Sequence, residues 1–186
     1  MKQPGVPMSD LARAFLDSML IENPVVMTFV GALLAAVLPR SARSSYTPAL
    51  RYALALFLAG MVGGAIAAAL PSVAAPAVYI VVGLLGVGSL LAVGELRGEW
   101  LGMPQAVLAT APLVGVQLLA STYGDFDLVV AAAGGSAIGF AVMFVLVGAI
   151  REASRISETT DTFKTNPVVL FSLAVFAIVF AGFLFW

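Results

Sequence analysis

The sequence contains no cysteine and no histidine among its 186 residues. Without cysteine the chain has no disulfide, no thiolate nucleophile and no thiolate to ligate an iron–sulfur cluster. Without histidine it also lacks the commonest nitrogen ligand of zinc. We therefore predict no cofactor and no metal centre in this chain.

Charge is scarce as well. Charged residues make up 10% of the chain, against about 25% in an average soluble domain. Hydrophobic residues make up 61%, and the mean hydropathy is +1.07. Too few charged residues are present to form the water-exposed surface of a globular protein. We therefore expect the chain to lie in a lipid bilayer. A net charge of −1 and the lack of a lysine or arginine cluster argue against nucleic acid as a partner.

Long apolar runs are abundant. Each is about 20 residues long, which is the length that a helix needs to cross the hydrocarbon core. A transmembrane barrel would instead alternate apolar and polar residues in shorter segments. We predict an all-α polytopic membrane protein, one domain over 1–186 with a tail at 1–14. Its six transmembrane helices are expected at 15–38, 50–70, 76–94, 103–121, 127–150 and 167–186.

Basic residues are distributed unevenly between the connections. Seven of them fall in the first, third and fifth connections: Arg40, Arg43, Arg51, Arg97, Arg151, Arg155 and Lys164. The other side carries only Lys2 and Arg13, both in the N-terminal tail. The positive-inside rule places the basic side in the cytoplasm. We expect both termini outside and the loop 151–166 in the cytoplasm.

Similar landmarks recur in the two halves of the chain. Pro24 matches Pro112, Gly64 matches Gly148 and Pro76 matches Pro167, in the same order. Two three-helix halves, 15–94 and 103–186, would then be related as an inverted repeat, because an odd number of helices flips the second half. Chance among many glycines and prolines is the alternative. Two GxxxG spacings, which begin at Gly60 and at Gly135, indicate close helix packing.

Helix-breaking residues interrupt the first and fourth apolar runs. Pro24 donates no backbone hydrogen bond, Glu22 is costly in hydrocarbon, and Asn23 can bond the freed backbone groups. The fourth run has a similar interruption. Broken helices at matching positions point to a central site, so the ion-path candidates are Glu22, Asn23, Pro24, Thr110, Pro112 and Gln117. The alternative is that the prolines only kink helices and that Glu22 lies at the membrane interface.

Four stretches stand out by their order and spacing: MLIENPVVMTFVGALLAAV (19–37), APLVGVQLLA (111–120), GFAVMFVLVGAIREASRI (139–156) and FAGFLF (180–185). Together they resemble the small six-helix membrane subunits of the Rnf and Nqr complexes (the RnfA/NqrE and RnfE/NqrD type). The resemblance implies an inverted-repeat fold and a paralogous six-helix partner among other membrane subunits. It also implies a sodium or proton pump in the bacterial cytoplasmic (inner) membrane.

The resemblance fails at the redox site. In that family a cysteine after each break ligates a cluster, and those two positions are Leu33 and Leu118 here. Leucine supplies no thiolate, so the chain is not expected to carry electrons. We expect the two leucines to fill the former cluster cavity with apolar packing.

Three functions remain open from the sequence. The first is an ion-path or assembly subunit of an Rnf/Nqr-like electron-transport complex, without a cluster of its own. The second is a stand-alone inverted-repeat transporter of ions or small solutes. The third is a structural scaffold of another energy-converting membrane complex. We do not expect catalysis by this chain alone, since no nucleophile–base pair or phosphate-cradling loop is evident.

Overall fold

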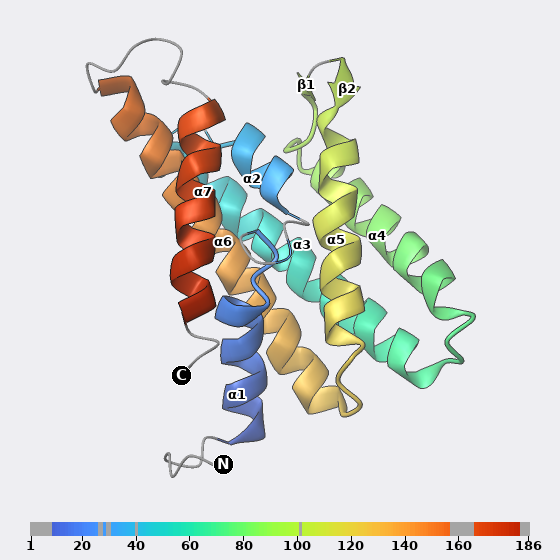
Figure 1. The fold of residues 1–186 in the computed structure, drawn as a ribbon. Coiled ribbons are helices and arrows are strands. Elements are labelled where there is room, and N and C mark those ends of the chain that lie inside the picture. The colour runs from blue at the N-terminus through green and yellow to red at the C-terminus, as the bar shows by residue number, and fades with distance from the viewer. Residues whose placement is uncertain are drawn as a thin grey trace.

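The computed structural model describes residues 9–25, 28, 31–39, 41–100, 102–156 and 166–182, and these are mostly helical. The order of elements is shown in Figure 1. In the first half they are α1 (Asp10–Leu16), a π-helical turn η1 (Asp17–Ile21), α2 (Ala32–Val37), α3 (Ala42–Ala69) and α4 (Ala75–Ala92).

A short hairpin joins α4 to the second half. Its strands β1 (Glu99–Trp100) and β2 (Met103–Pro104) pair antiparallel. Gly94, with φ at +87°, turns the chain out of α4 into this connection. The remaining helices are α5 (Gln105–Ala120), α6 (Phe126–Ile156) and α7 (Asn166–Ala181).

The two longest helices, α3 and α6, pack against each other at the centre. α4 and α5 lie along α3, whereas α1 and η1 lie along α6 (Figure 1). Glycines permit the close approaches, as their spacing predicted. A Cβ at Gly60 would lie 2.9 Å from the Ala133 Cβ, and one at Gly64 would lie 2.8 Å from the Ala120 Cβ.

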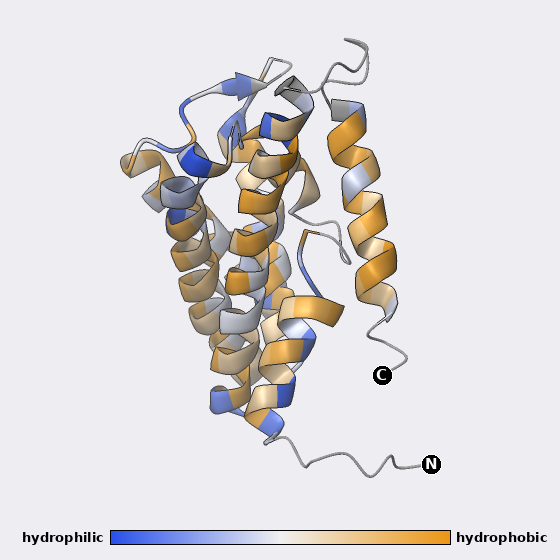
Figure 2. Cartoon of the chain, turned by 90° about the vertical axis from the view of Figure 1, so that its left-hand side faces the viewer, coloured by the Kyte–Doolittle hydropathy of each residue, from blue (hydrophilic) through white to orange (hydrophobic). Residues whose placement is uncertain are grey.

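Much of the apolar surface faces outward. Among the described residues, three helices are long and apolar enough to cross a membrane: α3, α4 and residues 126–154 of α6. The helices α5 and α7 are apolar but shorter. Figure 2 shows hydrophobic residues along the helices and hydrophilic ones gathered mainly at the two ends. Exposed apolar side chains cover α4 and α7 in particular: Ile80, Val81, Leu84, Leu85, Leu170, Phe171, Ile178 and Val179.

Several helices extend beyond the predicted spans. The helix expected at 50–70 begins at Ala42, because Ser41 caps its first turn by accepting a hydrogen bond from the Ser44 amide. The predicted tail 1–14 already contains the start of α1, which Ser9 caps. The helix expected at 127–150 continues to Ile156, so the first residues of the predicted 151–166 loop are helical. Residues 157–165 of that loop lie outside the described residues.

The fourth apolar run is not broken, which corrects the sequence prediction. α5 continues through Thr110 and Pro112 as one helix. A proline removes a single helical hydrogen bond, and α3 likewise continues through Pro48. Proline alone therefore does not break a helix in this chain.

The first apolar run is broken as predicted: its helical part stops at Ile21 and resumes at Ala32. The described parts of the three basic connections share one end of the bundle (Figure 1). The start of α3 contacts the end of α6 there, and Arg51 reaches Glu95 beside the hairpin. The six-span inverted repeat itself stays a prediction.

Candidate functional site at the break in the first segment

Asn23 organises the break. Its Nδ2 donates to the Met19 carbonyl at 2.8 Å, and its Oδ1 accepts from the Val25 amide at 2.9 Å. The residue before a proline is pushed out of the helical conformation, so the preceding carbonyls lose their usual partners. The Asn23 side chain replaces the backbone on both sides of the break, which is the role that the sequence suggested for it.

The far side of the break is also tied down. The Gly31 amide donates to the Pro24 carbonyl at 2.7 Å, which brings the start of α2 back to the proline. A Cβ at Gly31 would lie 2.9 Å from the Phe140 ring of α6. The described residue Gly31 on the far side of the break therefore lies against α6.

The backbone before the break packs directly against two glycines of α6. A Cβ at Gly139 would lie 2.6 Å from the Met19 carbonyl oxygen and 2.7 Å from Asn23 Nδ2. A Cβ at Gly135 would overlap the Phe15 carbonyl oxygen. The turn η1, which lies between Phe15 and Asn23 in the chain, is π-helical. Its closing hydrogen bond runs from the Glu22 amide to the Asp17 carbonyl at 2.8 Å. Such wide turns occur often at functional sites.

Glu22 stands at the end of this turn. Its Oε2 is buried and has no hydrogen-bond partner among the residues that the structure describes. A buried carboxylate oxygen without a partner is costly, and binding a proton or a small cation would relieve that cost. The geometry therefore makes Glu22 the strongest candidate for ion chemistry in the described part of the chain.

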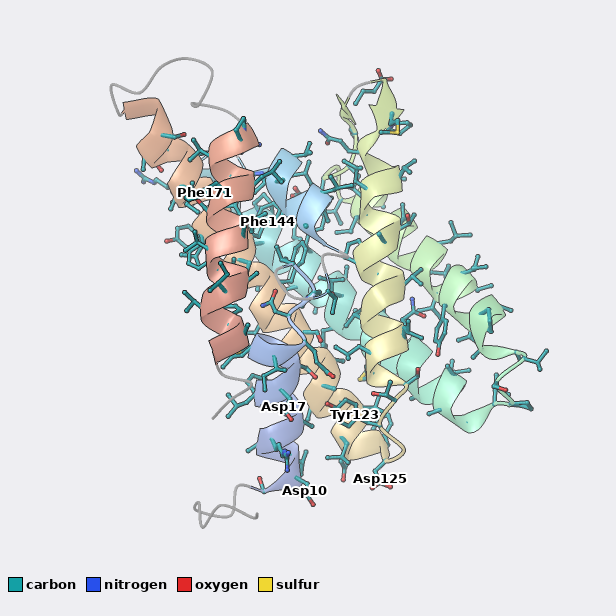
Figure 3. All side chains as sticks on the ribbon, in the orientation of Figure 1. Asp10, Asp17, Tyr123, Asp125, Phe144 and Phe171 are labelled. Carbon is teal, nitrogen blue, oxygen red and sulfur yellow. The ribbon has the colours of Figure 1, made fainter. Side chains whose placement is uncertain are left out.

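Tyr123, in the connection between α5 and α6, is close enough to Glu22 and Asp17 to interact with their charges. Burial raises the pKa of the Tyr123 hydroxyl, and the carboxylates of Glu22 and Asp17 raise it further, while Ser18 and Arg13 oppose them. Tyr123 therefore remains a neutral hydrogen-bond donor at physiological pH. Figure 3 shows Asp17 and Tyr123 at the end of the bundle opposite the hairpin.

The candidates from the fourth run are engaged elsewhere. Gln117 is fully buried, and its Nε2 donates to the carbonyls of Tyr79 in α4 and Leu113 in α5. Its amide also fills the space left by Gly63 of α3. Thr110 donates to the Val107 carbonyl in its own helix at 2.7 Å. Gln117 thus links three helices, and only the first run supplies an opened backbone.

Leu33 and Leu118 do not fill a cavity, which corrects that expectation. Leu33 of α2 is 54% exposed and Leu118 of α5 is 56% exposed. Each lies on the outward face of its helix, so neither contributes to the packed core.

Two residues of the Ile-Arg-Glu stretch have a role that the sequence did not reveal. Arg151 donates to the Ala36 carbonyl at the end of α2. Glu152 Oε2 accepts from the Ala42 amide at the start of α3, at 3.1 Å. Arginine suits the negative end of a helix and glutamate the positive end. We call this pair the α6 clamp; the sequence treated Arg151 only as a loop charge.

No cluster of three potential metal ligands occurs among the described residues. No known protein-family model matches the chain, and no curated protein matches it either.

Proposed function

We propose that the chain is a multi-pass membrane protein whose broken first segment forms part of an ion path. Its role would be that of a non-redox subunit in an Rnf/Nqr-like ion-translocating complex, with a paralogous six-helix subunit as partner. Protons or sodium ions are the proposed cargo. The site is Glu22, with Asp17, Ser18 and Tyr123 around it.

The single observation that carries this proposal is the buried Glu22 oxygen beside an opened helix. In a membrane, irregular backbone is tolerated where it is buried in protein or lines a cavity. Ionisable residues inside membrane segments are costly, so they mark ion pathways more often than structural positions. The exposed apolar surfaces of α4 and α7 support the membrane setting. The link to a redox complex is supported only by the four resembling stretches.

The test is ion flux in sealed native vesicles that contain the whole complex. Glu22→Gln keeps the size of the side chain and its hydrogen bonding but removes the charge. We expect flux to fall at least tenfold at equal assembly. Glu99→Gln is the matched control, because Glu99 is an exposed glutamate in the hairpin. Unchanged flux in Glu22→Gln over a range of pH would leave the chain with an assembly role.

The membrane orientation is tested separately. The absence of native cysteine means that a single introduced cysteine can be labelled without background. We expect Ser72→Cys to react with an impermeant thiol reagent from outside and Ser157→Cys only from inside. External labelling at Ser157→Cys and not at Ser72→Cys would overturn the orientation without bearing on Glu22.

A further inference from the structure

A cavity lies at the basic end of the bundle, away from Glu22. Its volume is about 300 Å³, which is at the lower end of the range for small-molecule sites. Five segments converge on it: the end of α2, the first turns of α3, the connection before β1, the start of α5, and α6. Its lining residues are Val37, Leu38, Ser44, Ser45, Pro48, Tyr52, Glu95, Gln105 and Phe144.

The polar side chains of this cavity are held in place by the fold. Tyr52 is 2% exposed, and its hydroxyl donates to the Glu95 carbonyl at 3.4 Å. The Glu95 amide donates to the Leu90 carbonyl at 3.0 Å, which closes the turn after α4. A Cβ at Gly98 would lie 2.7 Å from Gln105 Nε2, so the Gln105 amide lies against the backbone of this turn. Glu95 is thus fixed at the cavity from two directions.

The charge of the lining selects the ligand. Among the described residues that line the cavity, Glu95 alone is charged, and its side chain is only 13% exposed. Arg51 pairs with Glu95 Oε1 from outside the lining. A carboxylate has about four acceptor positions, so one arginine nitrogen does not exhaust it. The hydroxyl groups of Ser44 and Ser45 and the Gln105 amide add further acceptors.

The apolar wall complements this polar group. The rings of Tyr52 and Phe144 have centroids 5.5 Å apart, and both line the cavity. Aromatic faces attract ammonium groups, and the aliphatic side chains of Val37, Leu38 and Pro48 can cover a short alkyl chain. An anionic ligand would face Glu95 without a cation among the described lining residues.

We propose that this cavity binds the primary ammonium group of a small amphipathic amine, with Glu95 as its ion-pair partner. A free alkylamine and the ethanolamine headgroup of a phospholipid share this chemistry. The short apolar body lies against Phe144 and Pro48. Arg51 competes with the ligand for the same carboxylate, so the ion pair is looser when the amine is bound.

The experiment uses the purified full-length protein in phospholipid-free detergent. Ethylammonium chloride is titrated by calorimetry against sodium chloride at equal ionic strength. We expect saturable binding that weakens at least tenfold in Glu95→Gln, because a charge-assisted hydrogen bond is lost. Arg51→Gln should strengthen binding several-fold, since the competing guanidinium is gone. Arg43→Gln removes an exposed positive charge from the same end without touching Glu95, and it should leave the affinity unchanged.

A second arm distinguishes the two sources. Native mass spectrometry compares retention of phosphatidylethanolamine and phosphatidylcholine by the wild type and by Glu95→Gln. Glu95-dependent retention of phosphatidylethanolamine assigns the site to a lipid headgroup, and ethylammonium binding without it assigns the site to a free amine. The proposal is overturned if neither probe binds, if Glu95→Gln binds like the wild type, or if Arg51→Gln and Arg43→Gln shift the affinity equally. None of these outcomes depends on Glu22.

Discussion

The two proline-containing runs, 15–38 and 103–121, respond to proline in opposite ways. The first opens between Ile21 and Ala32, whereas the second continues as α5 through Pro112. Asn23 precedes the first proline and supplies both a donor and an acceptor to the opened backbone. Ala111 precedes the second and supplies neither. The difference teaches that a break needs a side chain that replaces the lost backbone bonds, and not only a proline.

The surroundings of the two runs differ as well. The backbone before the first break rests directly on glycines of α6, so the neighbouring helix fits the opened shape. α5 instead packs on α3 through side chains, with Val116 beside Gly60 and Ala120 beside Gly64. A helix that is packed through its side chains keeps its regular surface, because any opening would remove those contacts.

The largest expected effect tests this fit to α6. In Gly135→Ala the new methyl group would overlap the Phe15 carbonyl oxygen, so the segment before the break must shift. We expect a loss of about 3 kcal/mol of unfolding free energy in detergent. Gly134→Ala is the control on the adjacent position, where a Cβ would lie 3.7 Å from the nearest atom, in the Phe15 ring. Equal effects of the two substitutions would show that α6 does not shape the break.

The next prediction tests whether the Asn23 side chain replaces the backbone hydrogen bonds that the break removes. Asn23→Ala leaves the Met19 carbonyl and the Val25 amide without the partners that Asn23 provides. We expect a loss of about 2 kcal/mol, which is typical for buried backbone groups left unpaired. Thr110→Val is the control in the unbroken run, and its loss should stay below about 0.5 kcal/mol because the helix itself bonds the Val107 carbonyl. Chemical unfolding monitored by circular dichroism measures both, and a silent Asn23→Ala would contradict the role of Asn23.

The smallest predicted effect concerns the two prolines: replacing each with alanine should change the stability of the protein in opposite directions. Pro112→Ala restores a helical hydrogen bond, and we expect stability to rise by up to about 1 kcal/mol. Pro24→Ala adds a buried amide to a backbone that is already opened and frees a fixed φ angle, so stability should fall by up to about 1 kcal/mol. Thermal unfolding of the two variants side by side decides the matter. Shifts of the same sign would mean that the two runs do not differ in the way described.

The sequence predicted the parts of the fold that depend on local pattern. The apolar runs, the break at Glu22-Asn23-Pro24 and the close packing at glycine pairs all follow from residue type and spacing. The prediction from sequence failed where contacts with neighbouring helices determine the conformation. Pro112 looks like Pro24 in sequence, but α5 is held by α3 and α4. Leu33 and Leu118 were placed inside by analogy, whereas their outward faces depend on how α2 and α5 are rotated.

The site shows the same division. The capping chemistry of Asn23 follows from its side chain, and so does the cost of Glu22 in an apolar segment. Tyr123 could not be predicted, because its place beside Glu22 depends on how the connection between α5 and α6 folds back. The α6 clamp was hidden for a related reason: its two contacts join residues that are 115 and 110 positions apart.

The α6 clamp has a consequence for biosynthesis. A nascent chain that has emerged only through α5 contains the break, α2 and the start of α3, but it lacks Arg151 and Glu152, which hold their ends. It also lacks Gly135 and Gly139, on which the segment before the break rests. Before α6 is made, the opened shape of the first apolar segment therefore has only its local hydrogen bonds, those of Asn23 and of the Gly31 amide, and the support from α6 comes later. The first half of the chain is thus completed from its second half, which makes the whole chain, and not each half, the unit of assembly.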